Sequence, residues 1–238
     1  MADLFMINES QQSSQIISLK LSNATDHFFV RLTGGSGKIS FKDGVQGVTS
    51  LVRELSPFKG ILISGGTRII NKSDLKTHPS VQEVGSFIKA VNREIRVFGI
   101  VPRQEVLQIR KEGVLVTDEE SQFTIINPDF DVVLIVQKNV DDGSPWETEW
   151  RESFRIISQF RSYSDYRCAL IAYNGGNTTK DEIRVWAAYK WPVLLIKGSG
   201  RVTDELANNP EFLKENPTVS VISVNEIRAS LRLLSAKI

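Results

Sequence analysis

Cysteine and histidine are nearly missing from this chain of 238 residues, which has one cysteine and two histidines. The lone Cys168 cannot close a disulfide within the chain, and three such side chains are too few for a zinc site of histidine and cysteine. We therefore expect no metal site, and we expect no bound cofactor. With only His27 and His78 available as bases, a Ser–His catalytic triad is also disfavoured.

An excess of one charge is missing as well, since 29 Lys and Arg stand against 28 Asp and Glu. Nucleic-acid binding depends on a concentrated basic surface, so we expect no direct nucleic-acid binding. No apolar run is long enough for a membrane span, and the N-terminus lacks the pattern of a signal peptide. We expect a cytoplasmic location, which leaves a membrane-protein partner on another chain open.

Short apolar runs alternate with longer amphipathic stretches from residue 27 onward. The runs expected to be strands are Phe28–Leu32, Gly60–Ser64, Ile95–Val101, Val132–Gln137, Cys168–Tyr173, Val193–Lys197 and Val219–Val224. The stretches expected to be helices are Val45–Leu55, Val81–Asn92, Gln104–Lys111, Glu147–Arg161, Lys180–Lys190, Arg201–Asn208 and Glu226–Ser235. Continuous apolar strands that alternate with helices are typical of a parallel sheet covered on both faces. The sequence predicts an α/β fold with a doubly wound, mostly parallel, Rossmann-like sheet.

The first residues follow a different pattern. Asn8–Ser14 is polar and is expected to be a loop or tail, whereas Ile16–Leu21 alternates enough to predict a peripheral strand. No internal repeat, low-complexity tract or linker divides the rest. We therefore expect residues 1–26 to be an N-terminal extension and residues 27–238 to form one domain.

Glycine gathers where four of the predicted strands end, each time just before a predicted helix. The clusters are Gly34-Gly35-Ser36-Gly37, Gly65-Gly66-Thr67, Asn174-Gly175-Gly176-Asn177-Thr178 and Gly198-Ser199-Gly200. The carboxyl ends of parallel strands share one edge of a sheet, where ligands bind at the topological switch point. Glycine lets backbone N–H groups approach an anion, and a helix N-terminus adds partial positive charge. For any single cluster, turn geometry alone is the alternative explanation. Together the clusters predict a site for a phosphate-bearing, nucleotide-like ligand.

The spacing of these glycines differs from that of two common nucleotide-binding motifs. Gly34-Gly35-Ser36-Gly37 is not a GxGxxG sequence, and no acidic residue ends the second strand to hold a ribose. No cluster has the GxxxxGK[ST] spacing either. An ordinary dinucleotide-dependent dehydrogenase and a P-loop NTPase are therefore disfavoured.

Charged residues near the predicted edge are further candidates. Arg201 opens a predicted helix directly after Gly200, where its guanidinium could bind a phosphate in a bidentate manner. Asp204, in the first turn of that helix, is better explained as a cap. Arg68 and Arg103 each follow a strand end and could face the same crevice or be surface charges.

One helix stripe carries aromatic and acidic residues. Trp146, Trp150 and Phe154 recur every four residues, a spacing typical of core packing, although Trp146 could stack on a base. Glu147 and Glu149 could bond ribose hydroxyls or act as an acid/base pair in glycosidic cleavage. The alternative is that they complement the dipole of the first helical turn.

Several of these segments together resemble the SLOG superfamily, and most closely its LSDAT branch. That branch includes the N-terminal cytosolic regions of TRPM cation channels and their prokaryotic relatives. The stretches that carry the resemblance are Leu32–Gly37, Ile63–Thr67, Phe98–Pro102, Asn127–Asp129, Val133–Val136, Trp146–Glu149, Asn174–Glu182, Trp191–Ile196 and Gly198–Leu206. They span roughly His27 to Asn209, and the Gly-Ser-Gly-Arg run with its following Asp204 is the most specific. The resemblance implies a Rossmann-like fold that binds nucleotide derivatives, with Pro102 included among the ligand-binding residues.

The resemblance also bears on catalysis. A more distant branch, the LOG-type phosphoribohydrolases, carries a Pro-Gly-Gly-x-Gly-Thr-x-x-Glu loop. This chain has Asn174 in place of the proline and Thr178 in place of the third glycine, whereas Thr179 and Glu182 remain. It also has Arg68-Ile69-Ile70 where relatives commonly have Gly-Val-Met. These departures disfavour hydrolase activity.

Three functions remain open at this point. The first is a sensor whose loops bind a signal such as ADP-ribose or a cyclic nucleotide and thereby regulate an effector or channel, as in relatives associated with anti-phage defence. The second is a nucleotide N-glycosidic hydrolase with Glu182 or Glu147 as acid/base and Arg201 on the phosphate. The third is an assembly or gating module with a vestigial site. The expected partners are a nucleotide-derived small molecule, further copies of the chain and an effector or membrane protein.

Overall fold

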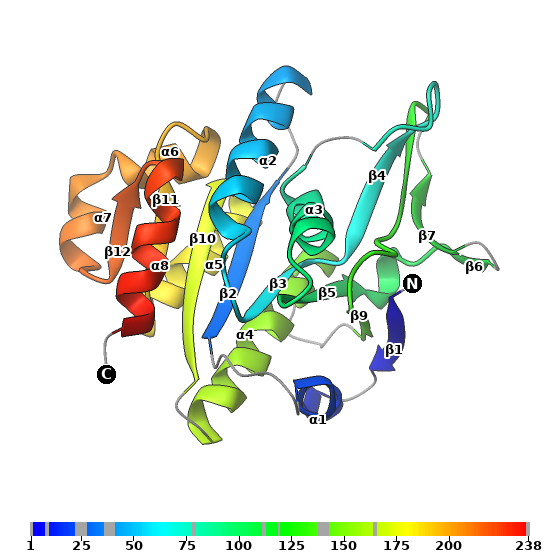
Figure 1. The fold of residues 1–238 in the computed structure, drawn as a ribbon, viewed down its shortest axis with the longest axis horizontal. Helices are drawn as coiled ribbons and strands as arrows, with labels where there is room; N and C mark the ends of the chain where they lie inside the picture. Colours follow the sequence, from blue (N-terminus) through cyan, green and yellow to red (C-terminus); the bar gives the residue numbers. More distant parts are fainter. Residues whose placement is uncertain are drawn as a thin grey trace.

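The computed structural model describes residues 2–7, 10–21, 28–35, 41–77, 80–110, 113–118, 120–137, 143–163 and 166–236. Within these ranges, eight strands form one sheet in the order β1-β9-β5-β3-β2-β10-β11-β12, and every neighbouring pair is parallel. The strands are β1 (Asp3–Ile7), β2 (Phe28–Gly35), β3 (Ile61–Gly65), β5 (Arg96–Pro102), β9 (Val132–Val136), β10 (Arg167–Asn174), β11 (Val193–Ile196) and β12 (Val219–Ile222). Figure 1 shows this sheet crossing the molecule between two layers of helices.

Helices cover both faces of the sheet, because strand side chains alternate between two apolar surfaces. One face packs against α2 (Phe41–Leu55), α3 (Val84–Val91) and α8 (Ile227–Ala236). The other packs against α1 (Ser10–Leu21), α4 (Pro145–Tyr163), α5 (Asn177–Ala188), α6 (Arg201–Ala207) and α7 (Pro210–Glu215). The predicted doubly wound, Rossmann-like fold is confirmed. Among the described helices, none is both long and apolar enough to cross a membrane.

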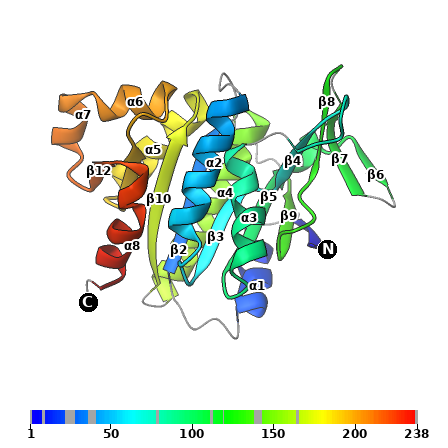
Figure 2. The same cartoon turned by 45° about the horizontal axis from the view of Figure 1, so that its top comes forward.

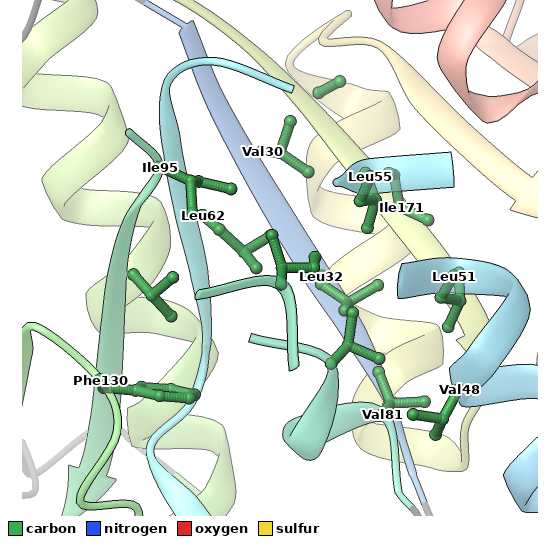
Figure 3. Close-up of a cluster of buried hydrophobic side chains, with 14 of the residues drawn as sticks. Val30, Leu32, Val48, Leu51, Leu55, Leu62, Val81, Ile95, Phe130 and Ile171 are labelled. Carbon is green, nitrogen blue, oxygen red and sulfur yellow. The ribbon is translucent and has the colours of Figure 1, made fainter. Parts of the chain in front are cut away.

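The core on the α2 side illustrates how the sequence pattern produces this packing. Val30 and Leu32 of β2 point to one face of the sheet, where they meet Leu51 and Leu55 of α2 (Figure 3). Phe29, which lies between them in the sequence, belongs to the opposite core. Each such side chain contributes about 1.5–3 kcal/mol by leaving water. The apolar run of β2 is therefore buried on both faces.

The strand order reverses between β2 and β10. From β2 the chain adds β3, β5 and β9 on one side, and β10, β11 and β12 then extend the sheet on the other side. β2 and β10 pair in parallel from Phe28↔Arg167 to Gly35↔Asn174. Their carboxyl ends therefore frame the topological switch point, the usual ligand position in an open α/β sheet.

A second, antiparallel sheet extends from the β5–β9 side of the main sheet (Figure 2). In the described residues it consists of β4 (Thr67–Asn71), β8 (Gln122–Ile126), β7 (Gly113–Asp118) and β6 (Gln108–Arg110). The predicted helix Gln104–Lys111 is wrong, because Gln108–Arg110 pairs with β7 and only a 3₁₀ turn at Arg103–Glu105 precedes it. β6 is a strand because it pairs with β7, and a prediction from the local sequence of Gln104–Lys111 cannot detect that pairing.

The N-terminal segment also differs from its prediction. Ile16–Leu21, expected as a strand, is the second half of helix α1, while Asp3–Ile7 forms the edge strand β1 beside β9. The expected loop at Asn8–Ser14 is likewise helical from Ser10. Ser13, Ile17 and Leu21 are buried at a spacing of four residues, which is the period of a helix face. Six residues, Ile16–Leu21, are too few for the spacing of apolar residues to distinguish a strand from a helix.

Candidate functional site

A cleft of about 230 Å³ opens at the carboxyl edge of the main sheet, beside the switch point. Gly34 and Gly35 at the end of β2, Gly65 at the end of β3 and Gly176 after β10 contribute to its wall. The side chains that complete the lining come from both layers of helices and from the strands: Arg31, Leu32, Thr33, Ser64, Val81, Gln82, Trp146, Glu149, Thr178, Thr179 and Glu182. The structure thus brings three of the four glycine clusters to one cleft.

Two glycines in this wall have neighbours that a Cβ would meet. Gly34 has φ +153°, and a Cβ there would overlap the carbonyl oxygen of Tyr173 on the paired strand. A Cβ on Gly176 would lie 2.9 Å from Nη2 of Arg201. A Cβ there would shift the flexible end of the Arg201 side chain, whereas glycine lets the guanidinium lie against the backbone where α5 begins.

The N-terminus of α5 faces the cleft. The helix begins at Asn177, and its N-cap residue, Gly176, has no side chain to bond the first turn. Thr178 and Thr179 of that turn line the cleft together with Gly176. A helix N-terminus carries partial positive charge and directs N–H groups outward, so this corner suits a phosphate.

A buried cluster of three charges forms the inner wall. Arg31, whose side chain is 2% exposed, projects from β2 between Glu149 of α4 and Glu182 of α5. Its Nε donates to Oε1 of Glu182 at 2.8 Å, and its Nη2 donates to Oε2 of Glu149 at 3.0 Å. One guanidinium therefore serves two carboxylates, and the cluster carries a net negative charge when both are ionised.

Proton affinities in this cluster are strongly perturbed. Burial raises the pKa of Glu149 to about 7, and the neighbouring Glu182 carboxylate adds to this rise, although Arg31 opposes it. Burial lowers the pKa of Arg31, but the two carboxylates raise it more, so that the guanidinium remains charged. Glu149 is thus poised to gain or lose a proton near neutral pH.

Glu147, the other acidic candidate on this helix, does not line the cleft. Its carboxylate accepts hydrogen bonds from the N–H groups of Gly143 (2.9 Å) and Ser144, and it pairs with Arg151 one turn along α4. These bonds hold the pKa of Glu147 below its usual range, although burial alone would raise it. Glu147 caps the start of α4.

The Gly65-Gly66-Thr67 cluster leads into a strand instead of a helix. Gly66 donates to the Ile100 carbonyl and accepts from the Asn127 N–H, and Thr67 opens β4 with its hydroxyl bonded to Gln82. The expectation that this cluster precedes a helix is wrong, because the chain passes directly into the second sheet. Only Gly65 of the three lines the cleft.

Arg68 lies away from the cleft, in a network that joins β4 to α3. Its Nε donates to Glu83 at 3.1 Å, and its Nη2 contacts Asp129 at 2.5 Å. Burial raises the pKa of Glu83 to about 7, against the opposing effect of Arg68. Since its guanidinium is bonded within the protein, Arg68 links β4 to the turn before α3 and to the loop between β8 and β9.

The N–H groups of the Gly198-Ser199-Gly200 turn bond a carboxylate of the protein itself. The Asp204 carboxylate accepts from the N–H groups of Gly198 at 2.7 Å and Gly200 at 3.0 Å. Asp204 is therefore a cap, as the sequence indicated. Gly198 and Ser199 line a neighbouring cavity of about 270 Å³ together with Tyr173 and Lys197.

The remaining candidates take different places. Asn174, with φ +60°, links two glycine turns by donating from Nδ2 to the Gly35 carbonyl (2.7 Å) and from its N–H to the Ser199 hydroxyl (2.9 Å). Pro102 is buried at the end of β5 and Arg103 is exposed beside it. Neither is among the residues that line the cleft. Ser36 and Gly37 lie outside the described residues.

Arg31, Gln82 and Thr179 line the cleft but were not among the predicted ligand-binding residues. Arg31 left a signal in the sequence, since it interrupts the otherwise apolar run Phe28–Leu32. An arginine inside a doubly covered strand requires buried acidic partners. Which acids these are follows only from the fold, because they lie 118 and 151 residues away.

The family described as "SLOG in TRPM, prokaryote" matches residues 81–232 of the chain. The chain belongs to this SLOG family. Membership of the family, together with the cleft, supports a ligand-binding domain in general. No curated protein sequence matches the chain significantly.

Solved structures share the fold at low sequence identity. The molybdenum cofactor carrier protein of Chlamydomonas reinhardtii has a TM-score of 0.52 at 17% identity, over 88% of this chain and 98% of that protein. A structural-genomics target, TM1055, has a TM-score of 0.53 at 20% identity, over 86% and 98%. The molybdenum cofactor binding protein of the phototrophic bacterium Rippkaea orientalis has 0.51 at 15%, over 87% and 96%.

Proposed function

We propose that this chain is a sensor domain whose carboxyl-edge cleft binds a nucleotide derivative of the ADP-ribose or cyclic-nucleotide type. The observation that carries the proposal is the juxtaposition, in one cleft at the switch point, of three glycine strand ends with the N-terminus of α5. The phosphate binds at Gly176–Thr179 with Arg201 beside it. The base binds near Trp146, which offers an aromatic face.

The inner wall supports recognition of hydroxyl groups more than of phosphate. Because Glu149 and Glu182 share one guanidinium, the wall has a surplus of negative charge when both carboxylates are ionised. Ribose hydroxyls are donors that suit such a wall, whereas a second anion is repelled by it. This polarity orients the ligand with its phosphate outward at α5 and its sugar inward.

A sensor must convert binding into a change of shape. The cleft joins segments that come from both helical layers, with Val81 and Gln82 on the α3 side and Glu149 and Thr179 on the α4–α5 side. A ligand that contacts both sides favours the arrangement in which they are close. The regulated partner, an effector or membrane protein, and assembly into a homo-oligomer are parts of this proposal.

Calorimetric titration tests the binding step. The panel is ADP-ribose, cyclic ADP-ribose and cyclic oligonucleotides, with the molybdenum cofactor added because two of the similar structures are named for it. At least one nucleotide derivative is expected to bind, and Gly176→Val should weaken binding at least ~10-fold, because its side chain would project from the wall of the cleft and shift Arg201. Arg184→Gln, an exposed change on α5, is the control. If the molybdenum cofactor binds and no nucleotide derivative does, the proposed function would change from sensor to cofactor carrier.

Hydrolysis of nucleotide N-glycosidic bonds is the second candidate, and Glu149 is the observation that favours it. A carboxyl group with a pKa raised to about 7 can donate and accept protons at neutral pH. Against it, Glu182, the glutamate retained from the LOG loop, is 1% exposed and bonded to Arg31. Chromatography after incubation with AMP distinguishes the two: free adenine whose release is lost in Glu182→Gln would establish the hydrolase.

A further inference from the structure

A second cavity, of about 360 Å³, lies at the amino edge of the sheet, at the opposite ends of the strands from the candidate site. Phe28 and Arg167, the paired first residues of β2 and β10, form part of its wall. The last turn of α2, the loop after it and one side of α8 form the rest. Figure 1 shows α2 and α8 over the same face of the sheet, with β10 visible between them.

The floor of this amino-edge pocket is apolar and partly aromatic. Phe28 and Leu231 are each 5% exposed, and the ring of Phe58 meets that of Phe28 edge-on with 5.8 Å between centroids. Phe58, in the loop after α2, is only partly buried and lines the pocket. An apolar floor of this kind suits a flat hydrocarbon or aromatic body.

The rim is rich in cations, some of which have internal partners. Lys59 pairs with Glu94 at 3.1 Å, and both side chains are exposed. Glu54, the acidic residue of the lining, pairs with Arg53 at 3.1 Å and lies 3.8 Å from Arg228. Lys59 and Arg228 are thus accounted for by carboxylates.

Arg167 and Arg232 are the other two arginines of the lining. Neither forms an ion pair with a carboxylate among the described residues, although both line the pocket. Arg167 donates from Nη1 to the Leu234 carbonyl at 3.4 Å, a long bond that occupies one of its five N–H groups. Within the part of the chain that the structure describes, two guanidinium groups therefore border one apolar floor without a carboxylate partner.

Capping of helix ends explains only part of this arrangement. Arg228 donates to the Arg53 carbonyl at the end of α2, and Arg167 bonds a carbonyl near the end of α8, as basic residues often do. The Nε of Arg228 nevertheless remains buried without a hydrogen-bond partner among the described residues. Among the described residues, Arg232 bonds no carbonyl at a helix end. Capping of helix ends also does not explain why these arginines surround a cavity.

We propose that the amino-edge pocket binds a small organic anion with a flat apolar body, such as an aryl phosphate or aryl carboxylate. The anionic group contacts the guanidinium groups of Arg167 and Arg232, which present paired N–H donors to planar or tetrahedral oxyanions. The body lies on Phe28, Phe58 and Leu231. This site is separate from the carboxyl-edge cleft and does not depend on the function proposed for it.

Calorimetric titration with 1-naphthyl phosphate tests the pocket directly. Two matched probes separate its parts, since 1-naphthol has the body without the charge and inorganic phosphate has the charge without the body. The wild-type chain is expected to bind 1-naphthyl phosphate at least ~10-fold more tightly than either. Equal or weaker binding of 1-naphthyl phosphate than of 1-naphthol would overturn the proposal.

Variants locate the binding. Arg232→Gln, an exposed change, should weaken binding of 1-naphthyl phosphate about tenfold, and Phe58→Ala should weaken it too. Arg184→Gln on α5 and Gly176→Val in the carboxyl-edge cleft should leave it unchanged, and thermal unfolding checks that each variant is folded. Binding that Gly176→Val abolishes and Arg232→Gln spares would assign the probe to the other cleft and refute the amino-edge site.

Discussion

The Nε of Arg31 lies 2.8 Å from Oε1 of Glu182, and both side chains are almost completely removed from solvent. The bond links the middle of β2 to the helix that follows the Gly175-Gly176 turn. It therefore fixes the position of α5, whose N-terminus faces the cleft. The same guanidinium also holds Glu149 of α4. Arg31 thus both fixes the position of α5 and forms part of the wall of the candidate site.

Replacing Arg31 tests how much this cluster matters for stability. Arg31→Met leaves two carboxylates buried without their cation, and we expect a loss of about 3–5 kcal/mol at pH 8, measured by urea unfolding. The triple variant Arg31→Met, Glu149→Gln, Glu182→Gln removes the unpaired charges and should recover most of that loss. A triple variant no more stable than the single one would show that packing, and not charge, is decisive.

The fold could be predicted well where structure is local. The alternation of apolar runs such as Phe28–Leu32 with amphipathic stretches such as Val45–Leu55 predicts the parallel sheet, because each element carries its own period. The second sheet could not be found this way. A single residue, Gly66, separates its strand β4 from β3, and β6 depends on pairing with β7.

The candidate site could likewise be predicted only in part from the sequence. Glycine at strand ends predicts the edge of the sheet, since parallel strands share one, and Gly34 and Gly176 line the cleft. Sequence position indicates that Asp204 is a cap, but it cannot show which N–H groups that carboxylate bonds, or that Arg68 is bonded to Glu83 and Asp129. The sequence does not show whether a charged side chain or an N–H group already has a hydrogen-bond partner in the folded protein.

The raised pKa of Glu149 makes stability depend on pH. The folded state holds this proton up to about pH 7, whereas the unfolded chain releases it near 4.5, so folding stability from this group falls as pH rises through that window. Glu149→Gln removes the effect. The variant should gain up to about 3 kcal/mol relative to wild type between pH 4.5 and 7.5.

Urea unfolding across this pH range measures that gain, with the exposed Glu211→Gln as the control. The control should follow the wild-type curve. Parallel curves for Glu149→Gln and wild type would contradict a proton bound at this carboxylate.

The cap formed by Asp204 can be tested separately. Asp204→Asn weakens the two bonds from the N–H groups of Gly198 and Gly200, and we expect it to cost about 1 kcal/mol. Glu205→Gln on the same helix, an exposed change, is the matched control and should cost less. Thermal unfolding compares them, and equal midpoints would argue against the cap.

Arg201 is expected to contribute to ligand binding. Its guanidinium lies against Gly176 at the start of α5. Arg201→Gln should weaken ADP-ribose binding about tenfold in calorimetry, the usual effect of losing a charge-assisted hydrogen bond to phosphate. Arg184→Gln should bind as wild type does, and equal affinities for the two variants would remove Arg201 from the site.

The most direct test of the central claim is the position of the ligand phosphate in a crystal structure of the complex with the tightest binder of the nucleotide panel. We predict that its oxygens lie within hydrogen-bond distance of the N–H groups in the first turn of α5, with the sugar toward Glu149 and the base beside Trp146. A phosphate bound anywhere else, including the amino-edge pocket, would contradict the proposed cleft.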